Sequence, residues 1–343
     1  MRVLQILLSP RIGGAESVST ALEHAWAPLG LEASLEYVEP DGELSPLARI
    51  TRLRSAIMSK RPDAIVSHSA IPNVYARVAA IGTGVPVICV MHSAGQDLDN
   101  KKLLIAERLL SPCTAAVVSV SEGQREEYQR HFPRAIVEQI PNGVSKDFFP
   151  AQADDVRPKR VIGVGRVVAQ KDPQTWIAAA TLACEKHPEA TFDWWGPSHL
   201  ENQWDSLVAR HSSLSGAVRF RGPTQDVAPL LRSASVFFHT AHREAHSIAL
   251  LEAAASGIPI VCTSAVGRTL PPWIVRDEFE AGDELGAASA LSSMISDYAV
   301  RHRSAMESAT RVHEEFGISA AAARYANLIE EVLFNSQRSS RGN

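Results

Sequence analysis

The stretch "HREAHSIALLEAAASGIPIVCT", residues 242–263, joins a helical pattern directly to a strand pattern. An alanine- and leucine-rich segment begins after Glu244, contains Glu252 and ends at a Gly-x-Pro sequence, where a β-branched run begins. A strand that is apolar on both faces and adjoins a helix is typical of a parallel sheet covered by helices. A carboxylate inside an apolar helix is unfavourable without a partner, so Glu252 indicates a site.

Similar apolar runs alternate with helix-length segments along the chain, in two series. This alternation predicts an α/β fold with two Rossmann-like domains, each built on a parallel sheet. The first series occupies residues 3–8, 63–69, 85–92, 115–121 and 137–144, and the second occupies residues 160–167, 190–196, 218–222, 235–240 and 258–264.

A polar, proline-bearing segment separates the two series. With 343 residues, 45% of them hydrophobic, the chain is long enough for two domains with separate cores. We predict a hinge near residues 147–159, an N-terminal domain over 1–150 and a C-terminal domain over 151–317. A periodic apolar helix over 318–336 is expected to pack back on the first domain, with residues 337–343 as a mobile polar tail.

The composition disfavours several classes of protein. The chain has 34 basic and 38 acidic residues, so no strong field would attract nucleic acid. Four cysteines are scattered without CxxC spacing, which favours reduced thiols over a metal site or disulfides. The first apolar run is broken at Ser9-Pro10-Arg11, too early for a signal peptide or a membrane span. We therefore expect a cytoplasmic protein.

Two loops that follow strands carry residues suited to an anion. Gly13 and Gly14 precede a predicted helix, and such glycines allow close backbone approach to a ligand, although an ordinary strand-to-helix turn has the same pattern. Arg166 and Lys171 follow the strand in "VIGVGRVVAQKD" and suit a pyrophosphate, although solvated surface charge is the alternative. Val168 stands where a dinucleotide fingerprint requires Gly or Ala, which argues against an oxidoreductase.

Seven residues separate Glu244 from Glu252, and Gly257 and Pro259 follow. This E-x7-E arrangement resembles the retaining glycosyltransferases of family 4, which have the GT-B fold. The blocks "GGAE", "VVSVSEGQREEY", "IPNGVSKDFF", "GVGRVVAQKD", "VRFRG" and "DVAPLLRSASVFFHTAHRE" follow the order of that family over about residues 5–335. The resemblance implies two Rossmann-like domains across a cleft, with a nucleotide-sugar donor bound mainly by the C-terminal one.

The resemblance also implies roles for the acidic motif and the helix that carries it. Glu252 would accept hydrogen bonds from the ribose hydroxyls, and Glu244 would contact hydroxyls of the transferred sugar. The N–H groups around His246, Ser247 and Ile248 would face the phosphates at the positive end of the helix. An arginine salt bridge is the structural alternative for Glu252, and a favourable helix-terminus charge is the alternative for Glu244.

Cations and a turn complete the implied donor site. Arg166 and Lys171 would neutralise the diphosphate leaving group, a task that a metal performs in other transferases, so the enzyme is expected to need no metal or other cofactor. Arg221 and Gly222 occupy the position where the family packs the base, although a simple strand-to-loop turn explains them equally well.

Two histidines of the first half are candidates for polar contacts. His92 ends an apolar strand, where family members often carry a histidine close to the reacting sugar, although a lone histidine at a strand end is more often structural. His68 is a further candidate for contact with the acceptor. Asp97 and Asp99 form a D-x-D sequence, which we interpret as a chance match to the metal motif of another glycosyltransferase fold.

Residues 47–61 predict a basic amphipathic helix with no acid in it. Such a helix can lie on an anionic membrane surface, which would suit a lipid-linked acceptor. The alternative is a charged helix face that is simply exposed to solvent. We therefore expect a cytoplasmic protein with possible peripheral contact at the inner face of the membrane.

The resemblance predicts transfer of a hexosyl unit, with retention, from a UDP- or GDP-sugar to a glycan or lipid-linked acceptor in cell-envelope or exopolysaccharide synthesis. The leaving diphosphate would help to deprotonate the incoming hydroxyl. Many family members read Glu-Gly-Phe-Gly where this chain has Glu244-Ala245-His246-Ser247, which leaves the sugar open. A nucleotide-sugar epimerase of the same architecture and a catalytically silent nucleotide-sugar-binding protein remain alternatives.

Overall fold

The computed structural model describes residues 1–343 except 11–12, 41–43, 94–95, 150–158, 199–216 and 342–343. The chain divides into two compact units, each with its own sheet and core. Unit 1 comprises Met1–Gly143 and Phe316–Asn343, and unit 2 comprises Val144–Glu315.

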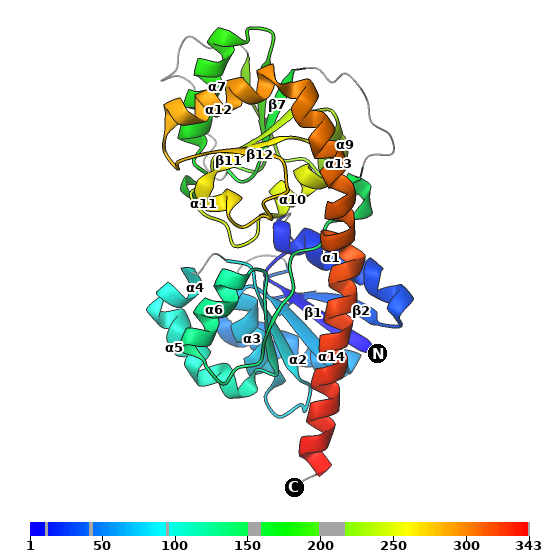
Figure 1. The fold of residues 1–343 in the computed structure, drawn as a ribbon. Helices are drawn as coiled ribbons and strands as arrows, with labels where there is room; N and C mark the ends of the chain where they lie inside the picture. Colours follow the sequence, from blue (N-terminus) through cyan, green and yellow to red (C-terminus); the bar gives the residue numbers. More distant parts are fainter. Residues whose placement is uncertain (11–12, 41–43, 94–95, 150–158, 199–216, 342–343) are drawn as a thin grey trace. The chain divides into compact units, whose positions relative to one another are not determined.

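Unit 1 contains a six-stranded parallel sheet in the order β2-β1-β3-β4-β5-β6 (Figure 1). Its central strands are apolar on both faces, with Leu4, Ile65 and Ile88 fully buried. The strands are β1 (Arg2–Leu7), β2 (Glu32–Tyr37), β3 (Ala64–His68), β4 (Val87–Met91), β5 (Ala116–Ser119) and β6 (Val137–Gln139).

The helices of unit 1 connect these strands, except for the last, which returns to unit 1 at the end of the chain. Trp26 on α1 donates from Nε1 to the carbonyl oxygen of Ala322 at 3.1 Å, and its ring packs edge-on against Tyr325. The last helix, α14, runs to Arg341, so residues 337–341 continue the helix where we predicted a polar tail. The helices are α1 (Gly14–Trp26), α2 (Pro46–Lys60), α3 (Ala70–Ala80), α4 (Gln96–Asp99), α5 (Lys101–Leu110), α6 (Glu122–His131) and α14 (Ile318–Arg341).

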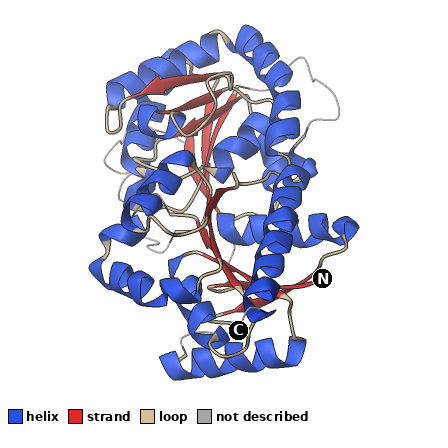
Figure 2. Ribbon diagram, turned by 60° about the horizontal axis from the view of Figure 1, so that its bottom comes forward, coloured by secondary structure: helices blue, strands red, loops and turns tan. Residues whose placement is uncertain are grey.

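Unit 2 contains a second six-stranded parallel sheet, in the order β12-β11-β10-β7-β8-β9. Figure 2 shows the strands of each sheet enclosed between helices. The strands are β7 (Arg160–Val164), β8 (Thr191–Trp195), β9 (Val218–Gly222), β10 (Val236–His239), β11 (Ile260–Thr263) and β12 (Arg276–Phe279). The helices are α7 (Pro173–Lys186), α9 (Val227–Arg232), α10 (Ile248–Ala255), α11 (Ser264–Gly267), α12 (Glu284–Ser296) and α13 (Tyr298–Phe316).

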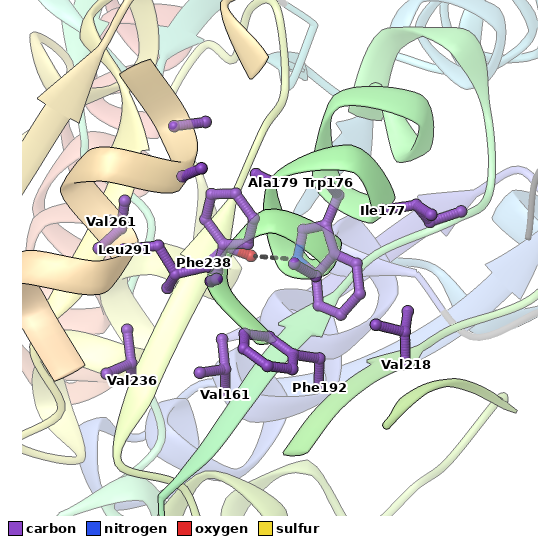
Figure 3. Close-up of a cluster of buried hydrophobic side chains, with 14 of the residues drawn as sticks. Val161, Trp176, Ile177, Ala179, Phe192, Val218, Val236, Phe238, Val261 and Leu291 are labelled. Carbon is purple, nitrogen blue, oxygen red and sulfur yellow. Dashed lines mark hydrogen bonds between the residues drawn. The ribbon is translucent and has the colours of Figure 1, made fainter. Parts of the chain in front are cut away.

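An aromatic cluster fills the core of unit 2 between its sheet and the neighbouring helices α7 and α12 (Figure 3). Trp176 on α7 stacks on Phe238, with ring centroids 5.8 Å apart, and packs edge-on against Trp194. The indole Nε1 of Trp176 donates to the carbonyl oxygen of Phe238 at 3.1 Å, so its polar atom is satisfied. Burial of each such aromatic side chain contributes about 2–3 kcal/mol.

The predicted α/β class with two parallel sheets is confirmed, and each of the ten predicted runs contains a strand. Two strands were missed, β2 with the sequence EASLEY and β12 with RDEF. Each is the outermost strand of its sheet, and outer strands carry polar side chains that break the apolar pattern. In the part of the chain that the structure describes, no helix has the length and apolar character needed to cross a bilayer.

Candidate active site

The sheet of unit 2 has a topological switch point between β7 and β10. These two strands are neighbours, but the chain continues from β7 towards β8 on one side and from β10 towards β11 on the other. In open α/β sheets, ligands bind at the carboxyl ends of the strands that flank such a point. The loops that leave β7 and β10 carry Lys171 and Glu244, two of the predicted site residues.

Backbone and side-chain hydrogen bonds tie these two loops together. The His242 amide donates to the carbonyl oxygen of Gln170 at 2.9 Å, and Gln170 Nε2 donates to the carbonyl oxygen of Arg243 at 3.0 Å. The hydroxyl of Thr240, itself almost fully buried, donates to the carbonyl oxygen of Lys171 at 2.8 Å. These hydrogen bonds therefore hold Lys171 next to Glu244 in the ligand-free chain.

Lys171 and Glu244 form an ion pair at this switch point. Lys171 Nζ contacts Glu244 Oε1, and each side chain is 15% exposed. The Nε2 atom of His239 lies 3.4 Å from the same carboxylate oxygen. Burial acts to raise the pKa of Glu244, but His239 and Lys171 outweigh it and the pKa falls to about 2. Glu244 is therefore ionised at neutral pH and can only accept hydrogen bonds.

The loop that carries Lys171 ends at a strained residue, Asp172, which is the N-cap of α7. Asp172 has a φ of 48°, in the left-handed region, and its carboxylate accepts from the Thr175 amide at 3.1 Å. Arg166 is exposed on the same loop. The two predicted cations thus lie on one loop, one paired with Glu244 and one facing solvent.

Helix α10 begins directly after Glu244, with Ser247 as its N-cap and Ile248 as its first residue. The Ser247 side chain does not cap the helix, so the first N–H groups of α10 are left for another acceptor. His246 is 7% exposed, and burial lowers its pKa to about 4, so its ring is neutral at pH 7.

Glu252 is the fifth residue of α10, next to Leu251 and Ala253, which are fully buried. Burial raises the pKa of Glu252 to about 8, so the carboxyl group carries its proton at neutral pH. Burial alone shifts this pKa, and no arginine forms an ion pair with Glu252 among the residues that the structure describes, so the arginine salt bridge is absent there. A half-buried, protonated carboxyl group can bind a ligand hydroxyl.

Arg221 and Gly222 end β9, the edge strand of the sheet opposite β12. Arg221 Nε donates to Asp193 Oδ1 at 2.9 Å, and Arg160 and Arg219 contact the same buried carboxylate. Gly222 has a φ of 76°, and its carbonyl oxygen accepts from the Gly196 amide at 2.9 Å. Arg221 is therefore part of an arginine cluster around Asp193, and only Gly222 has the backbone geometry of a tight turn.

In unit 1 the predicted glycines lie after β1, beside that sheet's own switch point between β1 and β3. Gly13 is the N-cap of α1 and Gly14 its first residue. A Cβ atom at Gly13 would lie 2.4 Å from Glu16 Oε2, so only glycine fits here without movement.

The two candidate histidines of unit 1 contact each other. His68 Nδ1 lies 3.1 Å from His92 Nε2, and His68 Nε2 lies 3.1 Å from Gln5 Oε1. His68 is only 1% exposed and His92 is half-buried, so the structure places His68 behind His92 and not at the surface where an acceptor would bind. Gln5 was missed from the sequence; the signal was a polar residue in the apolar run 3–8.

The basic helix predicted over 47–61 is α2, and unit 1 neutralises much of its charge. Arg52 and Lys60 pair with Glu36, and Arg49 pairs with Glu39. The acids lie on and just after β2, the strand that the sequence did not reveal, which is why the helix looked unbalanced. Membrane contact through this helix stays a prediction. Asp99 ends α4, and the side chain of Asp97 lies outside the described residues.

Two family models match the chain. Residues 12–148 match the model described as Glycosyltransferase Family 4, and residues 158–297 match the model described as Glycosyl transferases group 1. The chain is a family 4-like glycosyltransferase. The resemblance drawn from the ordered sequence blocks is thereby confirmed.

Relatives of this glycosyltransferase agree with that assignment. A Bacillus subtilis (strain 168) protein named as glycosyltransferase EpsF is 25% identical over 291 residues, 79% of this chain and 73% of that protein. The Escherichia coli UDP-Gal:alpha-D-GlcNAc-diphosphoundecaprenol alpha-1,3-galactosyltransferase is 23% identical over 260 residues, 69% of this chain and 66% of that protein.

Solved structures show that the glycosyltransferase has the GT-B fold. Anabaena Alr3699/HepE, in complex with UDP and glucose, superposes with a TM-score of 0.80 at 17% identity, covering 96% of this chain and all of that one. Sucrose-phosphate synthase from Thermosynechococcus elongatus gives the same TM-score and identity, covering 97% of this chain and 99% of the other.

Proposed function

We propose that this glycosyltransferase transfers a hexosyl unit, with retention, from a UDP-sugar to a lipid-linked glycan acceptor during synthesis of a cell-surface polysaccharide. The observation that carries the proposal is the ion pair between Lys171 and Glu244 at the switch point of unit 2, beside the uncapped start of α10. A cation, an ionised acceptor and free helix N–H groups lie within one short stretch of surface. This is the chemistry that a diphosphate bonded to a sugar requires.

In the proposed site, each group has one role. The start of α10, Lys171 and Arg166 bind the diphosphate, and their positive charge stabilises it as it leaves. Glu244, ionised because its pKa is about 2, accepts hydrogen bonds from hydroxyls of the transferred sugar. Glu252 binds the ribose hydroxyls, and because its carboxyl group is protonated without ligand, it can both donate and accept.

The proposed chemistry needs no metal and no other cofactor, because protein cations meet the diphosphate. The leaving diphosphate takes the proton of the attacking hydroxyl on the same face of the sugar, which preserves the anomeric configuration. The donor nucleotide and the acceptor class draw support from the names of two similar proteins, one bound to UDP and one acting on a diphosphoundecaprenol substrate.

Thermal melting of the full chain against UDP, GDP, ADP and dTDP, each with and without magnesium, tests the donor site. UDP at a hundred times its dissociation constant should add about 2.7 kcal/mol to the free energy of unfolding without metal. Lys171→Ala should lose this effect. Lys186→Ala, at the exposed far end of α7, the helix that follows the Lys171 loop, is the matched control and should keep it. Stabilisation by another nucleotide, or only with magnesium, would contradict the proposal.

The reaction itself is tested with UDP-hexose and a polyprenyl diphosphate saccharide. The product should keep the anomeric configuration of the donor, and an inverted product would refute retention. Conversion of the donor sugar without an acceptor would favour the epimerase alternative. Nucleotide binding with neither transfer nor donor hydrolysis would favour a silent binding protein.

A further inference from the structure

The buried polar chain of unit 1 has one fixed direction of hydrogen bonding, and a backbone carbonyl sets that direction. Gln5 Nε2 lies 3.0 Å from the carbonyl oxygen of Ser19, which can only accept, so this end of the Gln5 amide must be the donor. Gln5 Oε1 therefore faces the other side of the amide, where the Ser19 hydroxyl donates to it at 2.6 Å. Gln5 and Ser19 are fully buried, so no solvent competes.

The orientation of the Gln5 amide then determines which nitrogen donates and which accepts in the His68 and His92 rings. Gln5 Oε1 can only accept, so the His68 Nε2 atom at 3.1 Å must carry a hydrogen. Burial, together with His92, keeps the pKa of His68 well below its usual value, so the ring is neutral and Nδ1 has a lone pair. The His92 Nε2 atom, 3.1 Å from that lone pair, must then be the donor. Burial lowers the pKa of His92 to about 4, so its Nδ1 is unprotonated.

Backbone geometry holds His68 in place. The next residue, Ser69, has φ 77° and ψ 161°, a region that essentially only glycine adopts. Three hydrogen bonds maintain it: the Ser69 amide and Asn73 Nδ2 both donate to the carbonyl oxygen of Val90, at 2.9 and 3.1 Å, and the Asn73 amide donates to Ser69 at 3.0 Å. Strain of this kind gathers at functional sites, and here it fixes the strand end that carries His68.

We propose that Gln5 and His68 are positioning residues that hold His92 in its Nε2-protonated tautomer, so that His92 Nδ1 accepts a hydrogen bond from a sugar hydroxyl during transfer. His92 is half-buried, and its Nδ1 has no partner among the residues that the structure describes. The inference rests on the proposed function, since the hydroxyl belongs to the transferred sugar or to the acceptor. In either case His92 acts as an acceptor, not as a cation or a donor.

The tautomer can be measured without any turnover. Long-range proton–nitrogen correlation spectra of the ligand-free full chain, labelled on histidine nitrogen, report which ring nitrogen carries hydrogen, and His92→Asn assigns the signals. At pH 7 we expect His92 to be neutral, with hydrogen on Nε2 alone. Hydrogen on Nδ1, a doubly protonated ring or a mixture of tautomers would overturn the proposal, even if the enzyme transfers sugar as proposed.

The variant Gln5→Met removes the acceptor that sets the direction while keeping the side-chain length. We expect His92 to lose its single tautomer and kcat for transfer to fall about tenfold, with KM for the donor changed less than twofold. Ser67→Ala, next to His68 on β3, is the matched control and should keep both the tautomer and kcat. A Gln5→Met protein with a lowered melting temperature but an unchanged His92 tautomer and kcat would show a merely structural role and overturn the proposal.

Slow hydrolysis of the donor without acceptor identifies the hydroxyl. If Gln5→Met slows hydrolysis and transfer equally, the hydroxyl belongs to the transferred sugar. If it slows transfer alone, the hydroxyl belongs to the acceptor. If the wild-type chain neither transfers nor hydrolyses, the proposed function fails while the tautomer measurement still stands.

Discussion

The carboxyl ends of the two sheets differ in charge although both sheets are parallel and have a switch point of the same kind. In unit 2 the switch point between β7 and β10 carries an ion pair, Lys171 with Glu244. In unit 1 the switch point between β1 and β3 leads to a neutral chain of hydrogen bonds through Gln5, His68 and His92. The fold therefore determines where a site forms, and the side chains at that site determine whether it binds a charged diphosphate or uncharged hydroxyls.

The two regions should also respond to pH in opposite directions. Glu252 of unit 2 has a raised pKa in the folded chain, so the unfolded chain loses its proton first as pH rises. His92 of unit 1 has a lowered pKa, so the unfolded chain gains a proton first as pH falls. Alkali should therefore weaken unit 2 through Glu252, and acid should weaken unit 1 through its histidines.

The largest expected effect is the alkaline loss of stability from Glu252. Its pKa of about 8 lies above the ordinary 4.5, so its contribution is fully present below pH 4.5 and disappears as pH rises through 8. Between these limits the wild type should lose about 4 kcal/mol relative to Glu252→Gln. Urea unfolding of both proteins across this range measures the difference. A constant difference between them would show that the pKa of Glu252 is not raised.

The next effect separates the two partners of the ion pair. Glu244→Gln should reduce kcat about 10²–10³-fold, because the ionised acceptor for the sugar is lost. UDP binding should become no weaker, because Lys171 is released from its carboxylate. Lys171→Met should weaken both. Calorimetric titration of UDP and steady-state rates test this, and weaker UDP binding in Glu244→Gln would contradict the division of roles.

The third prediction concerns the stability of the uncharged hydrogen-bonded chain of Gln5, His68 and His92 in acid. The His92 contribution is fully present above pH 6.5 and is lost as pH falls through 4, because the unfolded chain binds the proton more readily. At pH 4 the wild type should have lost about 3 kcal/mol relative to His92→Asn. Denaturant unfolding between pH 7 and pH 4 measures it, and parallel curves for the two proteins would refute the prediction.

The smallest effect concerns Ser67, whose buried hydroxyl has no hydrogen-bond partner among the described residues. Ser67→Ala removes an unsatisfied polar group and should raise the free energy of unfolding by up to about 1 kcal/mol. Thermal unfolding checks it. A loss of stability would mean that the Ser67 hydroxyl has a hydrogen-bond partner, so that the hydrogen-bonded chain of Gln5, His68 and His92 has a further member on β3.

The sequence determined most of the architecture. The apolar runs revealed ten of the twelve strands in the described part of the chain, because buried parallel strands must be hydrophobic on both faces. The missed strands, β2 and β12, lie at sheet edges, where no second neighbour requires apolar side chains. The ordered sequence blocks also predicted the family, since each block is a short run of consecutive residues.

Only the tertiary structure decided which residues meet. Lys171 and Glu244 are far apart in the chain and come together because β7 and β10 are neighbours, an order that periodicity does not reveal. The same holds for Gln5, His68 and His92, which three separate strands bring together, and for the acids that balance α2. Hydrophobic pattern depends on the local chain, but pairing between polar groups depends on which strands become neighbours when the core closes.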